Sequence, residues 1–457
     1  MEQYVKYWIS GGLAVIACIW ISAFADNAQT EWAPETFTLE NGMEVVVLPD
    51  HRAPVVTHMV WYKVGAVDEE PGKSGIAHLF EHVMFKETDD LEDGEFDSII
   101  KSLGGQLNAF TSYDYTAYFE RVAKQHLGQM MALEAERMTD LIIDEDPQGS
   151  FITERDVVRE ERRQTLENNP GRVLQEMVLA EFWRDHPYEI TVIGRMEEVE
   201  ALTPQDGIDF YRKFYSPENA ILVVAGDVTG DEVRALAETH YGPIDPSGLV
   251  DGERKWTSVP PLTETKEVIH RDPKVRQPVW YRYYNGTSAV RDPEFAHALD
   301  VGTSVLGGGN TSLLYVALVE EQKIAINVGT FAMIGLHDEG PVGIFATPSP
   351  GVSIEALEAA VMAELTKQLD AGFSEADTVR VRNSKAASSI YARDSQSAMA
   401  QEYGSWLALG GEIEDVLNYP DMIRSVTPEQ ALEAVRSVFA EENHFIEAQL
   451  LPAEGAF

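Results

Sequence analysis

Apolar and polar positions in the first part of the chain alternate in the way that half-buried strands require. Residues 37–48 hold two such runs joined by Asn41-Gly42, which predicts a hairpin whose tight turn takes its positive backbone angles from this pair. The apolar run 55–64 is expected to join the same sheet. Aromatic and β-branched residues over 113–119 predict a further strand. Such a strand is usually buried, but at a sheet edge it can pair with an extended peptide.

A helical period replaces this alternation in residues 76–83, where apolar positions recur every three to four residues and give the helix a wide buried face. Ser74 ends the preceding loop of turn-forming residues and is expected to cap this helix. Residues 154–166 are also helical by composition. The first part of the chain therefore combines one sheet with helices behind it.

One local design occurs twice in the chain. Thr203 and Thr427 lie 224 residues apart (427 − 203), and each precedes a proline, with an acidic or amide residue three positions after the threonine. Asn219 and Asn443 follow these threonines at the same distance, 16 residues, and each opens an apolar strand. The repetition predicts two duplicated α+β units of roughly two hundred residues, a usual size for a domain.

Turn-forming residues over 244–262 predict a linker between the two units. The domains are accordingly expected at 34–243 and 263–457, preceded by a separate segment at 1–25. The 457 residues, 44% of them hydrophobic, can bury a large core. Acidic residues outnumber basic ones 76 to 35, a net charge of −41, which argues against a nucleic-acid partner.

The N-terminal segment has the pattern of an export signal. Residues 9–25 are largely apolar, follow Lys6 and end in Ala23-Phe24-Ala25, which is typical of a signal-peptidase site. An uncleaved membrane anchor and a lipoprotein site at Cys18 are the alternatives. Because Cys18 is the only cysteine, the mature chain would have no disulfides and no thiol nucleophile, as suits an exported, periplasmic bacterial protein. Contact with the membrane is expected only through this segment.

The helix over 76–83 contains the sequence His-x-x-Glu-His. His78 and His82 lie one turn apart on one helix face, close enough to bind one cation, while Glu81 can hang beside that cation. This order inverts the commoner zinc-peptidase spacing and is itself a zinc-enzyme signature. Two histidines are only part of a site, so a third ligand is required from another helix.

The helix over 154–166 offers two candidates. Glu154 and Glu161 are seven residues apart, which places them two turns apart on one face. Acidic residues on a charged helix are usually solvated, and Glu160 is interpreted in that way.

Five further segments complete a pattern that resembles the pitrilysin or insulinase family of zinc peptidases, which includes mitochondrial processing peptidase. They are 104–118, 154–161, 186–188 with 193–194, 215–219 and 223–227. The resemblance covers nearly the whole mature chain. It implies an α+β fold of two homologous halves, each a mostly antiparallel sheet covered by helices, which face each other like a clam shell.

The resemblance also implies the roles of individual residues. His78, His82 and Glu161 would bind one zinc ion per chain, and Glu81 would be the general base. Glu154 would assist the site, by fixing the orientation of a histidine ring if it approaches one. Asn108 and Ala109 would open the strand that binds the substrate. The activity implied is zinc-dependent endopeptidase hydrolysis of extended or unfolded peptides, with the zinc site in the domain at 34–243.

The second half departs from the family's pattern. It has no His-x-x-Glu-His, and active members carry an arginine and a tyrosine seven residues apart where this chain has Val319 and Ile326. Without these groups, stabilisation of an oxyanion is reduced. Some bacterial members of the family work as two chains, which suggests that a related subunit supplies the missing Arg/Tyr pair. The alternative is a noncatalytic exported scaffold or peptide-binding subunit.

Overall fold

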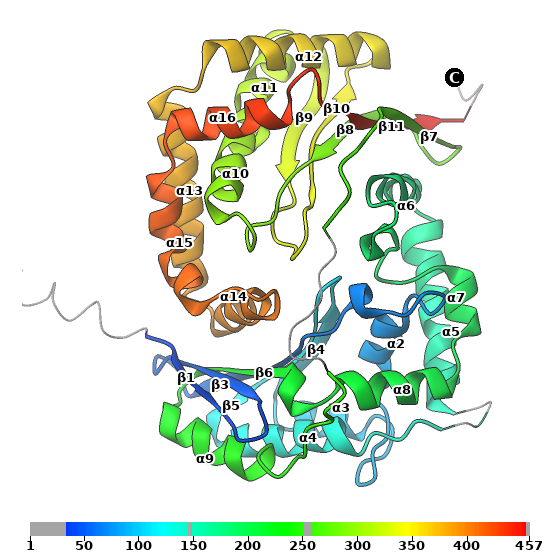
Figure 1. Ribbon diagram of the computed structural model, residues 1–457, viewed down its shortest axis with the longest axis vertical. Helices are drawn as coiled ribbons and strands as arrows, with labels where there is room; N and C mark the ends of the chain where they lie inside the picture. The colour runs from blue at the N-terminus through cyan, green and yellow to red at the C-terminus, as the bar shows by residue number, and fades with distance from the viewer. Residues whose placement is uncertain (1–32, 145, 147–148, 251–257, 454–457) are drawn as a thin grey trace, which may run out of the picture.

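The computed structural model describes residues 33–144, 146, 149–250 and 258–453, which form two halves, each built on one sheet (Figure 1). The first sheet has the order β1-β2-β6-β3-β5-β4. Its strands are β1 (Glu35–Thr38), β2 (Glu44–Pro49), β3 (Val55–Tyr62), β4 (Gln106–Thr111), β5 (Thr116–Ala123) and β6 (Ala220–Gly226). The second sheet has the order β7-β11-β8-β10-β9. Its strands are β7 (Lys266–Asp272), β8 (Val279–Asn285), β9 (Ala325–Ala332), β10 (Pro341–Pro348) and β11 (Phe445–Pro452).

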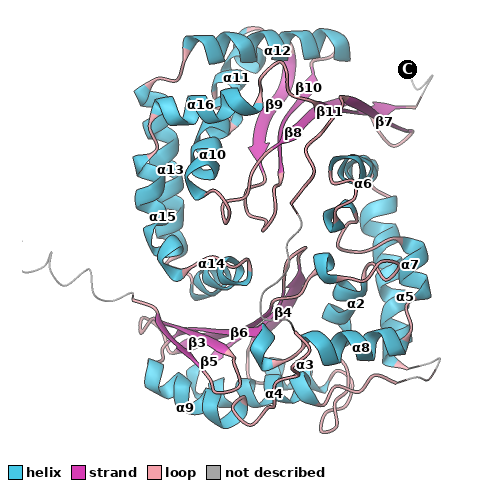
Figure 2. Cartoon of the chain, in the orientation of Figure 1, coloured by secondary structure: helices cyan, strands magenta, loops and turns pink. Residues whose placement is uncertain are grey.

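Helices cover both sheets (Figure 2). Those of the first half are α2 (Ile76–Val83), α3 (Glu95–Ser102), α4 (Leu127–Thr139), α5 (Ser150–Arg162), α6 (Pro170–Phe182), α7 (Met196–Ala201), α8 (Pro204–Phe214) and α9 (Gly230–His240). Those of the second half are α10 (Pro293–Gly307), α11 (Leu313–Tyr315), α12 (Ile354–Ala371), α13 (Glu375–Ala392), α14 (Gln396–Ala408), α15 (Ile413–Ser425) and α16 (Pro428–Val438). Short π-helical turns follow α5, at Arg163–Glu167, and α11, at Val316–Glu321.

The two sheets repeat one connectivity, which confirms the α+β fold of two homologous halves. In the first sheet β6 runs parallel to β2 and antiparallel to β3. In the second sheet β11 runs parallel to β7 and antiparallel to β8. The remaining pairs are antiparallel, as expected.

The duplicated turn has the same structure in both halves. Thr203 and Thr427 each cap a helix through a reciprocal capping box, as their spacing predicted. Asn219 and Asn443 each use the side-chain amide to donate to a carbonyl near the end of the preceding helix. Each asparagine thereby fixes the point at which the chain leaves a helix and enters the central strand of its sheet.

The hairpin of β1 and β2 forms as predicted, but its turn is not the tight one. Only Gly42 takes a positive φ, 93°, and the loop closes with a hydrogen bond from the Leu39 amide to the Met43 carbonyl. The Asn41 side chain donates instead to the carbonyls of Tyr241 and Ile244. Asn41 therefore makes tertiary hydrogen bonds through its amide nitrogen and a local one through Oδ1, which accepts from the Met43 amide at 3.3 Å.

Each sheet is covered on one face by a helix of the opposite half. Helix α14 packs on the first sheet, where Met399 and Tyr403 join a core with Trp61 and Val223. Helix α6 packs on the second sheet through a core of its own. That core includes Leu174, Val178, Phe182, Val268, Ile446 and Ala448. Both helices lie between the facing sheets, α14 in orange and α6 in green (Figure 1), so the clam shell is held by an exchange of helices.

Buried polar groups also join the halves. The Tyr188 hydroxyl donates to Asp114 at 2.6 Å, and Asp114 accepts the backbone amide of His337 from the second half. His186 lies 3.2 Å from Asp338 of the second half, and both side chains are fully buried. The loop between β9 and β10 is therefore anchored to the first half by directional bonds.

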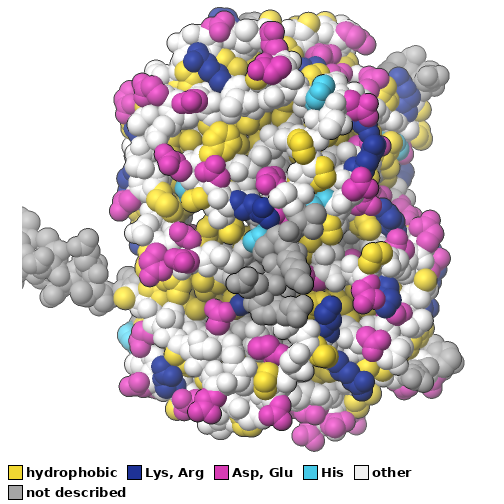
Figure 3. Space-filling view, in the orientation of Figure 1, with side chains coloured by type: hydrophobic (Ala, Val, Ile, Leu, Met, Phe, Trp, Pro, Cys, Tyr) yellow, Lys and Arg dark blue, Asp and Glu magenta, His cyan; other side chains and the backbone are white. Residues whose placement is uncertain are grey.

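Three further expectations concern the export segment, the domain limits and the acidic surface. The proposed export segment 1–25 lies outside the described residues, and no helix within those residues is long and apolar enough to cross a membrane. The domain limits 34–243 and 263–457, with the linker 244–262, stay a prediction. Acidic side chains are spread over the visible face rather than gathered in one patch, as a solvated surface requires (Figure 3).

Candidate metal centre

Helix α2 sets the position of the two histidines. Its apolar residues, among them Leu79, Phe80 and Val83, are fully buried against the first sheet and its helices. His78 and His82 lie on the remaining face with ring centroids 5.1 Å apart. Because the helix is fixed by packing along its length, the two rings are held one turn apart without a metal.

The N-terminus of α2 is satisfied by Glu69 and not by Ser74. The Glu69 carboxylate accepts from the amides of Gly75 at 3.0 Å and Ala77 at 2.9 Å. Ser74 points elsewhere, and its hydroxyl accepts from the Arg195 amide, so the expected cap was wrong. Burial raises the pKa of Glu69 to about 8, and the two amide donors oppose that rise. A carboxyl group from the preceding loop thus anchors the start of the helix.

Helix α5 supplies a carboxylate to the same place. Glu161 Oε2 lies 3.5 Å from His82 Nε2 and 3.8 Å from His78 Nε2. One donor atom from each of the three residues lies within 4.8 Å of the other two. Two imidazoles and one carboxylate are a donor set that zinc takes in catalytic sites, with a position left for water. The residues present therefore fit a zinc ion.

The surroundings shift the pKa values of the two rings in opposite directions. Burial, with the neighbouring His82, lowers the pKa of His78 to about 4, so its ring is neutral as a metal ligand must be. Burial also disfavours the charged form of His82, but the carboxylates of Glu154 and Glu161 outweigh it and raise the pKa of His82 to about 9. The same carboxylates favour a divalent cation at this position.

Glu154 contacts the His82 ring on the side opposite Glu161. Its Oε2 lies 3.3 Å from His82 Nδ1, the ring nitrogen on the side away from Glu161. Its Oε1 lies 2.7 Å from Lys86 Nζ, and Lys86 also pairs with Asp93 at 3.3 Å. The carboxylate therefore fixes the orientation of the His82 ring and is itself held by a lysine.

Glu81 points toward the edge strand of the first sheet. The Thr111 hydroxyl, at the end of β4, donates to Glu81 Oε2 at 2.6 Å. Burial raises the pKa of Glu81, and this hydrogen bond opposes the rise. A partly buried carboxylate with a raised pKa is suited to accept a proton near neutral pH.

Strand β4 forms one edge of the sheet and lies in contact with α2. It carries Asn108, which is exposed, and Ala109, which is buried and pairs with Tyr118 of β5. The residues 113–119, expected to form a buried strand with an edge strand as the alternative, fall mostly in β5, which is flanked on both sides by other strands. The edge strand near α2 is therefore β4, the strand before the aromatic run and the one that carries Asn108 and Ala109.

Comparison with known proteins agrees with this geometry. The model of the insulinase family, peptidase family M16, matches residues 44–195, and that of the peptidase M16 inactive domain matches residues 201–385. The chain belongs to peptidase family M16. A zinc protease, PqqE, of Helicobacter pylori is 33% identical over 396 residues, which are 84% of this chain and 85% of that protein.

Solved M16 structures have the same fold. The crystal structure of a protease from Helicobacter pylori matches with a TM-score of 0.85 at 29% identity, covering 92% of this chain and 100% of that chain. The periplasmic protease PqqL from Escherichia coli matches with a TM-score of 0.77 at 19% identity, covering 93% of this chain and 48% of that chain. The second of these shows a common fold only.

The second M16 half brings no charged side chain at the two positions that the sequence singled out. Val319 lies in the π-helical turn after α11 and packs against the core of the second half. Ile326 lies on β9, an edge strand, with 44% of its surface exposed. Neither side chain can donate a hydrogen bond.

Sequence reasoning missed three residues that support this M16 site. Thr111 holds Glu81, Lys86 holds Glu154, and Glu69 holds the start of α2. Lys86 lies three residues beyond the end of α2 at Val83, so helical spacing gave no signal for it. Thr111 and Glu69 are brought in by loops and strand pairing, which spacing does not reveal.

Proposed function

We propose that this chain is a zinc-dependent endopeptidase that hydrolyses extended or unfolded peptides, and that it is the zinc-bearing subunit of a two-chain enzyme. One observation carries the proposal: His78, His82 and Glu161 converge with donor atoms within 4.8 Å, while Glu81 hangs beside them on the same helix. A scaffold that had lost its chemistry would have no need to keep both the ligands and the base.

The residues around the metal centre have separate tasks in the proposed reaction. When bound, zinc supplies a polarising charge that lowers the pKa of a water molecule and activates the scissile carbonyl. Glu81 accepts the proton from that water and returns it to the leaving amine, and Thr111 keeps its carboxylate in place. Glu154 holds the His82 ring in one orientation. The free edge of β4 pairs with the backbone of the substrate beside these groups.

The apolar pair Val319 and Ile326 supports the two-chain form. A hydrolytic site of this kind needs a donor for the oxyanion, and neither side chain offers one. We propose that a related subunit lacking the zinc motif supplies an arginine and a tyrosine. Export to the periplasm is part of the proposal and rests on the apolar segment 9–25.

Zinc content and hydrolysis of a quenched peptide library, measured on the pure chain with and without the companion subunit, test the proposal. The wild-type chain should bind one zinc ion and cleave peptides only when the companion is present. Glu81→Gln should keep zinc and lose cleavage, whereas His78→Ala should lose both. A Glu81→Gln chain with full activity contradicts the assignment of the base. A zinc-loaded wild-type chain as active alone as with its companion contradicts the two-chain form, and a pair that never cleaves favours the scaffold.

A further inference from the structure

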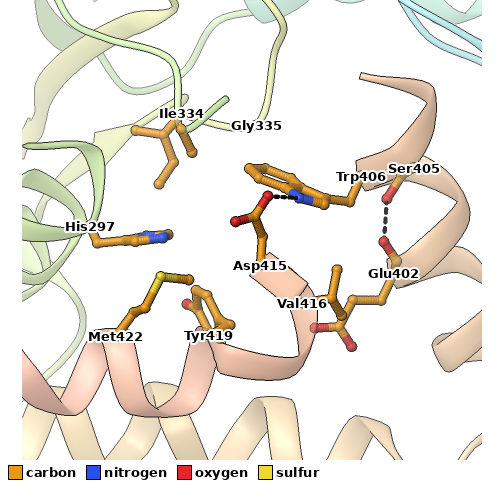
Figure 4. A pocket seen from close by; sticks show the side chains of 11 residues that line it. His297, Ile334, Gly335, Glu402, Ser405, Trp406, Asp415, Val416, Tyr419 and Met422 are labelled. Carbon is orange, nitrogen blue, oxygen red and sulfur yellow. Dashed lines mark hydrogen bonds between the residues drawn. The ribbon is translucent and has the colours of Figure 1, made fainter. Parts of the chain in front are cut away.

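A cavity of about 240 Å³ lies in the second half, among α10, α14, α15 and the loop between β9 and β10 (Figure 4). Its walls are mostly apolar. The apolar walls are formed by Ile334, Trp406, Val416, Tyr419 and Met422, and the polar groups among them are His297, Glu402, Ser405 and Asp415. Every lining residue lies between positions 289 and 422, so the metal centre contributes none of them. The cavity is therefore a separate feature of the fold.

His297 lines this cavity with a polar group that the protein does not use. Its side chain is 6% exposed, and its Nδ1 has no hydrogen-bond partner among the described residues. The ring reaches into the cavity and faces Asp415 (Figure 4). Burial lowers the pKa of His297, so the ring is neutral, and the nearby Lys385 is occupied by Asp300 at 2.8 Å. A buried imidazole without a partner is costly unless something else satisfies it.

Asp415 presents a free carboxylate oxygen on the other side of the cavity. Its two hydrogen bonds, from Trp406 Nε1 and from the Glu412 amide, are both 2.9 Å long and both end on Oδ2. The second oxygen points toward His297 across the cavity (Figure 4). No lysine or arginine lines the cavity, so the negative charge of Asp415 is not neutralised from within it. Carboxylate and aromatic faces together form an environment that attracts organic cations.

We propose that this cavity binds an arylalkyl ammonium group, whose charge rests on Asp415 and whose apolar body packs against Trp406 and Tyr419. The cavity is smaller than a usual drug-sized pocket, which limits the group to about ten non-hydrogen atoms. A free amine and the N-terminal residue of a peptide share this chemistry. The ammonium donates to the free Asp415 oxygen, and the His297 ring contacts the apolar body of the ligand.

The position of the cavity predicts what an occupant would do. Ile334 and Gly335 belong to the loop whose next residues, His337 and Asp338, are bonded to the first half. Trp406 extends from α14, the helix that covers the first sheet. A ligand in the cavity would therefore contact both attachments between the halves, and its binding energy would stabilise the joint.

Calorimetric titration of the full chain with phenethylamine tests the proposal, with phenethyl alcohol as the neutral analogue of the same shape. Asp415→Asn removes the charge and keeps both hydrogen bonds, because the amide oxygen can occupy the place of Oδ2. Glu414→Gln is the matched control, since Glu414 is the exposed neighbour and undergoes the same change of charge. The expected result is binding of the amine that weakens by about tenfold in Asp415→Asn and stays unchanged in Glu414→Gln.

Two further measurements complete the design. Phenylalanine amide, which is closer to the size limit of the cavity, is compared with its N-acetylated form. Binding of the free form alone shows that the site also accepts the N-terminal residue of a peptide. Thermal unfolding of the wild-type chain should shift upward with phenethylamine and not with the alcohol. Equal binding of alcohol and amine overturns the proposal, and so does an absence of amine binding to the wild-type chain.

Discussion

Replacing Glu154 by glutamine tests how the proposed zinc ligands are oriented. The substitution keeps the size of the side chain but removes the charge that lies 3.3 Å from His82 Nδ1 and 2.7 Å from Lys86 Nζ. Changes of groups that bond a metal-bound histidine usually cost ten- to hundredfold in metal affinity, which is about 1.4 to 2.7 kcal/mol. The loss should fall inside this range, because the change also leaves the Lys86 ammonium without its closest counter-charge, beside the cation.

Competition with a chromophoric chelator measures the zinc affinity of each variant. Glu160→Gln is the matched control, since Glu160 lies on the same helix, is exposed and should have no effect. A double variant, Glu154→Gln with Lys86→Met, should recover part of the loss because the unpaired ammonium is gone. Glu154→Gln binding zinc as tightly as the wild type would refute the role given to Glu154, and full additivity in the double variant would refute the role of Lys86.

Three more outcomes are expected. Gly404→Ala should destabilise the chain by about 2 kcal/mol in urea unfolding, because the added Cβ overlaps the ring of Trp61; Gly171→Ala, where the Cβ meets only ordinary contacts, should not. Burial raises the pKa of Glu134 to about 8 in the folded chain, from its usual value of 4.5. Between these two pH values the folded chain keeps a proton on Glu134 that the unfolded chain has released. Stability should therefore fall from pH 5 to 8, and Glu134→Gln should flatten that fall, as equilibrium unfolding at each pH can show. Removal of zinc with a chelator should lower the melting temperature reversibly, by an amount that grows with the zinc concentration of the reference sample, as calorimetry can measure.

The two candidate histidine ligands were predictable because their spacing in the sequence determines that they lie on one helix face. Helical spacing puts His78 and His82 on one face, and the structure adds Glu161 to them, as the family resemblance implied. The supports were not predictable, because Thr111 reaches Glu81 through the packing of a helix against a sheet edge. Ser74 was predicted to cap α2, which is wrong. Its hydroxyl instead accepts a hydrogen bond from the amide of Arg195, about 120 residues away in the sequence. Local rules fail where a tertiary partner competes for the same atom.

The sequence predicted where several strands lie along the chain but not their order in the sheet. The apolar runs correctly located β2, β3 and β6, whereas the edge position of β4 follows from pairings that no single run contains. The duplicated caps at Thr203 and Thr427 did carry long-range information, since two copies of one turn imply two copies of the fold around it. The exchange of α6 and α14 left no periodic signal, because a helix face looks the same whichever sheet it covers.

The exchange of α6 and α14 between the halves affects how the chain folds during synthesis. The face of the first sheet that carries Trp61 and Val223 stays bare until α14 has been made, some 170 residues after β6 is complete (396 − 226). The first half therefore stays incompletely covered while the rest of the chain is made, and it is not expected to be stable when expressed alone. A chain truncated before α14 would expose this apolar face of the first sheet.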